Sequence, residues 1–226
     1  MPVVFTTNSS NAKKTSFLII TGGVGVGKST LITRLQKIYG EQIGVIKEFI
    51  DYSPEKGKAY LEDFLHCRMN CFEFQSFILD CYNAQLKDFC GTKRVVVMER
   101  GPFDSVGVFT GQSLNDGGIS QEGYDRLIQR VRELEVQYGI PSSSHLKIEV
   151  RDMATLSAQN VFDSLKGLIF KTVETRGDLL MYLYSSNPQK QLQNIAKRGR
   201  PEERNYNVDY MLKINQAYAD LFANRM

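Results

Sequence analysis

The 226-residue chain has no tryptophan, little histidine and no apolar run long enough to cross a bilayer. Its two histidines, His66 and His145, have no partner at metal-ligand spacing and are interpreted as ordinary. The chain also has no large excess of charge of one sign, because 28 basic and 25 acidic residues leave a formal net charge of +3. That balance is too mild to indicate a nucleic-acid or membrane partner. The N-K-x-D motif is absent, which excludes a guanine-specific GTPase.

Cysteines are few and form no C-x-x-C pair; they are Cys67, Cys71, Cys81 and Cys90. They lie within helical patterns, which indicates free buried thiols in a reducing compartment, and we expect a cytoplasmic protein. Residues 1–15 predict a disordered leader rather than a signal peptide. An organellar address stays open there, although the leader has no arginine to support it. Residues 16–226 predict one globular domain.

A glycine-rich stretch over residues 22–30 fits the phosphate-loop pattern G-x-x-x-x-G-K-[ST]. An apolar run over residues 17–21 predicts a buried strand before it, and residues 29–39 carry a helical spacing after it. Backbone N–H groups of such a loop surround phosphate oxygens, and the helix N-terminus favours negative charge. We expect Lys28 to reach the outer phosphates and the Ser29 hydroxyl to ligate Mg²⁺. The predicted ATP-binding residues of the loop are Gly22, Gly23, Val24, Gly25, Val26, Gly27, Lys28, Ser29 and Thr30.

Strands alternate with helices along the rest of the chain. Residues 43–46, 94–98 and 179–184 predict buried strands, whereas 59–89, 124–138, 192–196 and 208–222 predict helices. Residues 51–58 and 142–144 predict loops, 145–150 fit a strand, and 161–171 fit either a helix or a strand. This order favours an α/β fold whose parallel sheet is covered by helices on both faces. Ligands of such sheets bind at the carboxyl ends of the strands.

Charged residues follow two of the predicted strands. Glu48 comes after the second strand and suits a general base, although a carboxylate there is also commonly only solvated. Glu99 and Arg100 follow the third strand. The Glu99 carboxylate is a candidate to bind Mg²⁺, and Arg100 is a candidate to orient Glu48 or the acceptor. A structural ion pair is the alternative for these two. Farther along, Arg198 and Arg200 flank Gly199 in a basic loop that suits phosphates or is merely a solvated turn.

Together these pieces resemble the deoxyribonucleoside kinase family, which includes deoxycytidine, deoxyguanosine, mitochondrial thymidine and insect multisubstrate kinases. The matching pieces are the phosphate loop, Glu48, the Phe-Gln-Ser-Phe segment at 74–77, Glu99-Arg100, and the Arg-Gly-Arg-Pro-Glu-Glu segment at 198–203. The resemblance covers roughly residues 16–110 and 176–222. It implies a P-loop kinase fold with a basic lid over about 194–206, an atypical insertion within about 110–175, ATP with Mg²⁺, and a homodimer.

The resemblance also assigns roles to individual residues. It implies that Glu48 is the base, that Arg100 lies near the acceptor 5′-hydroxyl, and that Gln75 pairs with the nucleobase. Arg198 and Arg200 would clamp phosphates, and Glu203 would contact the sugar 3′-hydroxyl.

The chain departs from the family pattern at several positions. Gly101 stands where serine is usual, and Asn194 stands where the lid often has another arginine. The tyrosine that helps hold the 3′-hydroxyl is replaced by Phe64, with Tyr60 one helical turn earlier, and Tyr52 is expected to fill the space of a missing tryptophan.

Two further departures concern the nucleobase. Tyr82 and Ser105 replace the arginine and aspartate of the purine- and cytosine-reading members. This favours thymidine or a broad pyrimidine range.

We therefore expect an enzyme that transfers the ATP γ-phosphoryl group to the 5′-hydroxyl of a deoxyribonucleoside. A nucleoside monophosphate kinase of the thymidylate type shares the loop and the lid, but it needs extra cations for the acceptor phosphate. Near Glu48 the sequence offers only Lys47 and Arg100. A nucleotide-dependent switch or binding protein is the alternative from another class.

Overall fold

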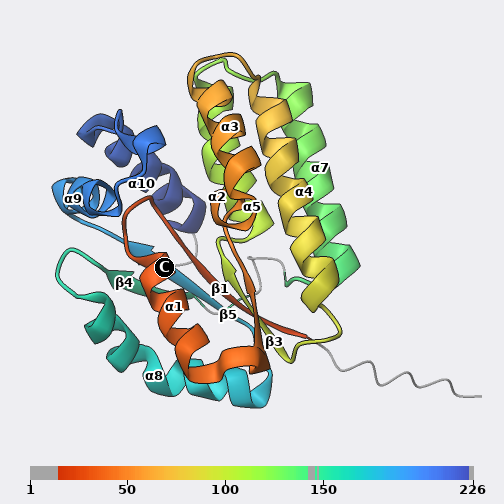
Figure 1. The fold of residues 1–226 in the computed structure, drawn as a ribbon, viewed down its shortest axis with the longest axis vertical. Helices are drawn as coiled ribbons and strands as arrows, with labels where there is room; N and C mark the ends of the chain where they lie inside the picture. Colours follow the sequence, from red (N-terminus) through yellow and green to blue (C-terminus); the bar gives the residue numbers. More distant parts are fainter. Residues whose placement is uncertain (1–14, 142–145, 147, 224–226) are drawn as a thin grey trace, which may run out of the picture.

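Five parallel strands form one sheet in the computed structural model, which describes residues 15–141, 146 and 148–223 (Figure 1). The strand order is β2-β3-β1-β5-β4. The strands are β1 Ser16–Gly22, β2 Ile43–Ile46, β3 Val95–Glu99, β4 Ile148–Asp152 and β5 Leu179–Tyr184. Every residue of β1, β2 and β3 is buried, as expected for continuous apolar runs inside a parallel sheet. The predicted α/β P-loop kinase fold is confirmed.

Helices cover both faces of the sheet because successive side chains of a strand point in opposite directions. Phe17 and Ile19 of β1 belong to one apolar core, whereas Leu18 and Ile20 belong to the other. The first core is closed by α4 (Cys71–Phe89), α7 (Gln121–Tyr138) and α10 (Val208–Phe222). The second is closed by α1 (Lys28–Tyr39) and α8 (Ala158–Thr175), which lie on the same side of the sheet in Figure 1.

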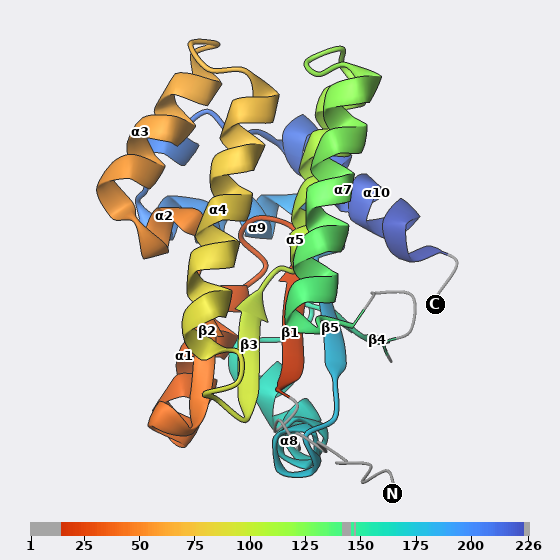
Figure 2. The ribbon, with the colours of Figure 1, turned by 90° about the vertical axis from the view of Figure 1, so that its right-hand side faces the viewer.

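The register brings the carboxyl ends of three strands to one edge. Ile20 of β1 pairs with Glu99 of β3, and Met98 pairs with Ile46 of β2. Helices α3 (Pro54–Leu65), α4 and α7 project beyond this edge in Figure 2. The chain between β3 and α7 forms three short helical pieces there: α5 (Pro102–Ser105), the π-helical η2 (Val106–Thr110) and α6 (Gly111–Asn115). The functional groups at the strand ends are therefore enclosed by helices.

The remaining pieces border the same edge. They are α2 (Phe49–Tyr52), α9 (Pro188–Arg198) and the 3₁₀ turn η4 (Pro201–Glu203), with a further 3₁₀ turn, η1 (Gly40–Gln42), at the opposite end of α1. Helix α9 ends at Gly199, whose φ of 71° is left-handed, as is common directly after a helix. The basic loop predicted from the sequence thus follows a helix terminus.

The predicted loop over residues 51–58 is wrong, because all of these residues except Ser53 belong to α2 and α3. Pro54 occupies the first turn of α3, where its missing N–H is not needed. Gly57 lies inside α3, and a Cβ there would come within 2.9 Å of the Ile50 Cα. Proline and glycine therefore mark a helix start and a close helix contact rather than a loop.

Residues 145–171, whose secondary structure the sequence left open, contain one strand and one helix. The strand expected at 145–150 lies slightly later, at 148–152, and 161–171 fall within α8. Val161, Leu165 and Ile169 are buried at four-residue spacing, which is the pattern of a helix with one covered face. The predicted leader up to residue 14 and the loop at 142–144 lie outside the described residues. No helix within 15–141 and 148–223 is long and apolar enough to cross a membrane.

Candidate active site

The phosphate loop joins the end of β1 to the start of α1, as the sequence predicts. Gly22 has a φ of 136°, and a Cβ there would lie 1.9 Å from the carbonyl oxygen of Leu183. Gly25 has a φ of 76°, and a Cβ there would lie 2.6 Å from the carbonyl oxygen of Gln191. Both positions require glycine, because an added side chain would collide with neighbouring backbone. The loop is therefore shaped by contacts with β5 and α9.

Lys28, Ser29 and Glu99 form a compact polar group beside this loop. Lys28 Nζ donates to the carbonyl oxygen of Gly23 at 2.7 Å and lies 3.9 Å from Glu99 Oε1. Ser29 Oγ donates to the same carboxylate oxygen at 3.0 Å. Burial and, after it, the nearby Arg100 lower the pKa of Lys28 to about 8. Burial also raises the pKa of Glu99 to about 7, and the neighbouring Glu48 carboxylate acts in the same direction. Bound phosphates would favour the charged lysine.

The donor set of this group fits Mg²⁺. The Ser29 hydroxyl and the Glu99 carboxylate present hard oxygen atoms to the same space. Among residues 15–141, 146 and 148–223, no cluster of three or more histidine, cysteine, aspartate or glutamate side chains could hold a metal alone. Mg²⁺ commonly takes one or two protein ligands and completes its shell with water and phosphate oxygens. Ser29 and Glu99 are therefore the groups that would hold it.

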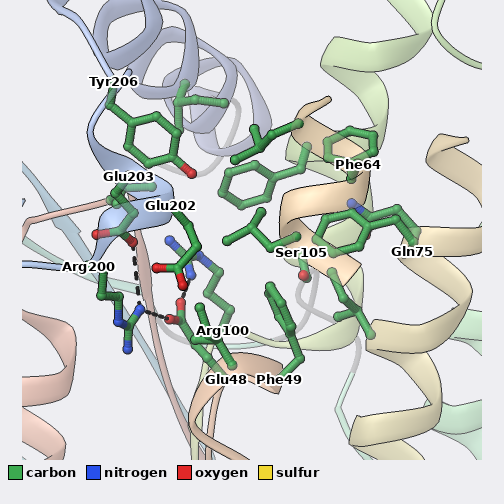
Figure 3. Close-up of a pocket in the computed structure, with 18 of the residues that line it drawn as sticks. Glu48, Phe49, Phe64, Gln75, Arg100, Ser105, Arg200, Glu202, Glu203 and Tyr206 are labelled. Carbon is green, nitrogen blue, oxygen red and sulfur yellow. Dashed lines mark hydrogen bonds and ion pairs between the residues drawn. The ribbon is translucent and has the colours of Figure 1, made fainter. Parts of the chain in front are cut away.

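Glu48 and Arg100 form a buried ion pair where β2 and β3 end. Arg100 Nη1 donates to Glu48 Oε1, and Arg200 Nη1 lies 3.6 Å from Glu48 Oε2 (Figure 3). Burial alone would raise the pKa of Glu48, but Arg100, Lys28 and Arg200 outweigh it and hold that pKa at about 2. Glu48 is therefore ionised throughout the physiological range. The arrangement unites the predicted base with two of the predicted cations.

The arginines of the lid are paired with carboxylates. Arg198 contacts both carboxylate oxygens of Glu203, at 3.0 Å from Nε and 2.5 Å from Nη2. Arg200 Nη2 donates to Asp51 Oδ1 at 2.6 Å, and its Nη1 lies 3.6 Å from Glu203 Oε1. Arg200 also lies beside the Glu48 carboxylate at the end of β2. The pair with Asp51 was not expected from the sequence, because the two residues lie 149 positions apart.

A cavity of about 520 Å³ extends from Lys28 and Glu48 into the space between α3, α4, α5 and α10. Its far end is aromatic: the rings of Phe64 and Phe74 stack with centroids 4.6 Å apart. Gln75 is buried there, and its Oε1 has no hydrogen-bond partner among the described residues. Figure 3 shows Gln75 and Phe64 across the cavity from Glu48 and Arg200. A buried amide oxygen without a protein partner is available to accept a hydrogen bond from a ligand.

The other predicted substrate residues divide into two groups. Tyr82, Ser105 and Glu203 line the cavity, whereas Tyr52 and Tyr60 do not. Tyr52 is exposed on α2, and the Tyr60 ring packs on Phe77 with centroids 4.3 Å apart. The rotation of α2 and α3 directs both tyrosines away from the cavity, and this rotation is not readable from residue spacing alone.

Three buried residues that the sequence analysis did not single out surround Arg100. Arg100 Nε donates to Tyr218 Oη at 3.0 Å, and Thr21 Oγ1 donates to Asp104 Oδ2. Thr21 and Tyr218 are fully buried, and Asp104 is nearly so. The Gly-Pro-Phe-Asp segment at 101–104 gives one signal for Asp104, since proline followed by an acidic residue is typical of a helix start.

A phosphate loop, an ion-paired carboxylate at the strand ends and a basic segment after α9 are the features of a phosphotransferase of the P-loop class. A family model described as "Deoxynucleoside kinase" matches residues 18–146. The chain belongs to this family and is an ATP-dependent deoxyribonucleoside kinase.

Solved structures share the fold at low sequence identity. Deoxyadenosine kinase from M. mycoides with bound dCTP aligns with a TM-score of 0.57 and 18% identity, covering 92% of this chain and 84% of that one. The same enzyme with bound dATP gives 0.55 and 17%, covering 93% and 86%. A search of curated proteins found no match.

Proposed function

We propose that the chain transfers the γ-phosphoryl group of ATP to the 5′-hydroxyl of a pyrimidine deoxyribonucleoside, with thymidine or a broad pyrimidine range as acceptor. One observation carries the proposal: a single cavity has the unpaired Gln75 oxygen at one end and the Glu48–Arg100 pair, beside Lys28, at the other. A nucleoside bound between them would place its base on Gln75 and its hydroxyl on Glu48.

Glu48 would act mainly by orienting the acceptor. With a pKa of about 2, its carboxylate is a weak base but a permanently ionised acceptor for the 5′-hydroxyl proton. Phosphoryl transfer passes through a loose transition state, so positioning and charge neutralisation contribute more than full proton removal beforehand. Arg100 would keep the carboxylate in place, and Glu48 would take the proton as the new O–P bond forms.

The donor side would neutralise the triphosphate. Lys28 would contact the outer phosphates, and Ser29 and Glu99 would hold Mg²⁺, which supplies electrostatic stabilisation of the developing phosphate charge. Arg198 and Arg200 would exchange their carboxylate partners for phosphate oxygens, since a phosphate is the more highly charged anion. Glu203, released from Arg198, would be free to accept from the sugar 3′-hydroxyl.

The base preference is argued from Tyr82 and Ser105. Tyr82 is buried, and its hydroxyl lies 3.3 Å and 3.2 Å from the carbonyl oxygens of Glu99 and Arg100. The hydroxyl therefore binds backbone, while the ring occupies the wall of the cavity beside Ser105. Ser105 offers one neutral hydroxyl and no charge. A wall with a bulky ring and no charged pair favours one-ring bases, and Gln75 supplies the donor and acceptor that a thymine edge needs.

A competition assay tests this function. The chain is given equal concentrations of the four deoxyribonucleosides, with thymidine monophosphate and deoxycytidine monophosphate in parallel, and products are separated by chromatography. We expect nucleoside monophosphates as products and a higher kcat/KM for thymidine than for deoxyadenosine or deoxyguanosine. The two solved structures described above are of a deoxyadenosine kinase, so deoxyadenosine is the informative competitor. A purine preference would contradict the pyrimidine assignment, and phosphorylation of monophosphates alone would contradict the acceptor class.

We also propose, from the family resemblance, that two copies form a homodimer. Sedimentation velocity at assay concentration checks this, and a monomer with full activity would contradict it.

A further inference from the structure

Side chains of α9 bind the backbone of the phosphate loop directly. Gln191, which is only 1% exposed, donates from Nε2 to the carbonyl oxygen of Val24 at 2.9 Å. Asn194, three positions later, donates from Nδ2 to the carbonyl oxygen of Gly25 at 2.8 Å. Residues three apart lie on the same face of a helix, so one face of α9 is directed at the loop.

Asn215 of α10 holds the Gln191 side chain in place. The two amides form a reciprocal pair, in which Gln191 Nε2 donates to Asn215 Oδ1 at 3.2 Å and Asn215 Nδ2 donates to Gln191 Oε1 at 2.7 Å. Asn215 Nδ2 also donates to the carbonyl oxygen of Ser185, directly after β5, at 3.4 Å. Two side chains therefore join α10, α9, the end of β5 and the phosphate loop.

The two backbone carbonyls fix the orientation of both amides. A carbonyl oxygen can only accept, so the NH₂ group of Gln191 must face Val24 and the NH₂ group of Asn215 must face Ser185. Each amide oxygen then lies beside the NH₂ group of the other amide, and all four bonds pair a donor with an acceptor. Turning over either amide would place like groups opposite each other.

The bonds to α9 determine where the loop directs its own N–H groups. In a planar trans peptide, the C=O and the following N–H point in opposite directions. Because the carbonyls of Val24 and Gly25 point at α9, the N–H groups of Gly25 and Val26 point away from it. Successive N–H groups directed to one side form the concave surface that binds phosphate oxygens.

Gly23 supports this arrangement independently. It stands at a variable position of the phosphate-loop pattern, and its φ is not in the left-handed region. A Cβ at Gly23 would nevertheless lie 2.7 Å from Asn215 Oδ1 and 3.0 Å from Gln191 Nε2. The amide pair thus occupies the space that a side chain at position 23 would need, which explains the glycine there.

We propose that Gln191, Asn194 and Asn215 are positioning residues for ATP: their amides hold two carbonyls of the loop against α9 and so direct the following N–H groups at the triphosphate. The proposal rests on the proposed role of the loop as the phosphate site, and none of the three side chains contacts the phosphates in it. Helix α9 also carries Arg198 as its last residue. One helix therefore orients the phosphate loop and presents a lid arginine.

Gln191→Met is the primary variant, because methionine has a similar length and lacks the amide that binds Val24. Asn215→Leu removes the other half of the pair with little change in shape, and Asn194→Ala removes the bond to Gly25. Gln193→Met is the matched control, since Gln193 is an exposed glutamine on the same helix. It separates the loss of these bonds from a general effect of glutamine replacement in α9.

Binding of ATP with Mg²⁺ is measured by calorimetry in the absence of a nucleoside, after circular dichroism has shown folded protein. Steady-state kinetics then give the KM for ATP and for the nucleoside that the competition assay identifies as preferred. We expect Gln191→Met and Asn215→Leu each to weaken ATP binding about tenfold, because each leaves a buried polar group unpaired, with the nucleoside KM nearly unchanged. The exposed bond of Asn194 should contribute less, about twofold. Gln193→Met should bind ATP as the wild type does.

The double variant Gln191→Met with Asn215→Leu tests whether the two amides act as one unit. We expect it to bind ATP within about twofold of the weaker single variant, since both substitutions break the same pair. Losses that multiply would overturn the proposal, because independent defects multiply. ATP and nucleoside affinities that fall together would also overturn it, since a general structural defect affects both sites.

The outcomes separate this proposal from the proposed function. If Lys28→Ala weakens ATP binding while Gln191→Met and Asn215→Leu bind ATP as the wild type does, the positioning role is overturned and the phosphate site stands. Wild-type ATP affinity in Lys28→Ala would overturn the phosphate-site assignment and this proposal with it. Calorimetry without a nucleoside keeps both results independent of the acceptor. Asn215→Leu keeps the test decisive where Gln191→Met does not fold.

Discussion

Arg200 Nη2 lies 2.6 Å from Asp51 Oδ1 and joins the lid to the short helix that follows Glu48. The Asp51 side chain is 43% exposed, so the pair is weak, worth about 0–1 kcal/mol. It nevertheless competes directly with phosphate for the same guanidinium. The lid arginine is thus held beside the acceptor carboxylates by a contact that a nucleotide can replace.

Replacing Asp51 with asparagine should therefore ease nucleotide binding. We expect Asp51→Asn to lower the KM for ATP by up to about fivefold, the equivalent of about 1 kcal/mol, without a loss of kcat. Asp63→Asn is the matched control, because Asp63 pairs with Arg68 at 2.7 Å on the exposed end of α3. A rise in the KM for ATP would show instead that Asp51 holds Arg200 in its working position.

The phosphate-binding cations give the largest expected losses. Lys28→Ala, Arg198→Ala and Arg200→Ala should each slow phosphorylation, and an arginine that clamps the transferred group contributes roughly 10³–10⁵ in rate. Lys197→Ala is the control, since this residue is exposed in the last turn of α9 beside Arg198. Rates are measured with saturating ATP and thymidine. Wild-type rates in all three variants would refute the phosphate assignment.

Glu48→Gln separates orientation from binding. The amide keeps the shape of the side chain but removes the ionised acceptor, and loss of a general base typically costs about 10²–10⁴ in rate. We expect the loss in single-turnover rate, with nucleoside affinity by calorimetry largely retained. Glu55→Gln, at an exposed position in the first turn of α3, should change neither quantity. An unchanged rate would direct attention to Asp51 or Glu99 as the base.

Sequence patterns predicted the parts of the site that are encoded locally. The phosphate loop and the strand ends were readable because each lies within a few residues of an apolar run, whereas Gln75 was expected at the substrate from the family resemblance. Thr21 and Asp104 are 83 positions apart, and Arg100 and Tyr218 are 118 apart, so only the packing of β1, α5 and α10 brings them together. The spacing of residues along the sequence does not predict such a contact.

Helix rotation sets a second limit on what the sequence predicts. Tyr52 and Tyr60 were expected at the substrate from their distance along the chain to matching positions, yet neither lines the cavity. Tyr206, on the lid, does line it, and its hydroxyl points into the cavity in Figure 3. Which face of a short helix contacts a ligand depends on tertiary packing, and residue spacing along the sequence does not give it.

Base preference should respond to Tyr82 and Ser105 together. The double variant Tyr82→Arg with Ser105→Asp places opposite charges where the purine- and cytosine-reading relatives carry them, and we expect kcat/KM to shift toward deoxycytidine or the purines. Tyr82→Phe is the control: it keeps the ring and loses the contacts to the Glu99 and Arg100 carbonyls, so it should lower turnover without changing preference. Competition among nucleosides at equal concentration measures both. An unaltered preference in the double variant would contradict the role of this wall.

The pH dependence of stability should report the buried Asp104 carboxylate. Burial raises its pKa from 3.8 to about 6, although Thr21, Arg100 and Gly101 favour the charged form. Because the folded pKa lies above the unfolded one, the folded state binds the proton more tightly, and ionisation of Asp104 destabilises it. This contribution to the free energy of unfolding is therefore greatest below about pH 4 and is lost between about pH 4 and 6, a change on the order of 3 kcal/mol.

Asp104→Asn removes this titration, and the difference between the two proteins reports it together with its effect on the neighbouring Glu135. Glu135, whose pKa burial raises to about 7 with Asp104 among the causes, titrates in both. Denaturant unfolding is measured from pH 4 to 8 for the wild type and for Asp104→Asn. We expect wild-type stability, relative to the variant, to fall as the pH rises from 4 to 6 and to level off above it. A constant difference would mean that the pKa of Asp104 is the same in the folded and unfolded states. The expected fall would show that the chain keeps a buried carboxylate whose ionisation destabilises the folded state above about pH 6.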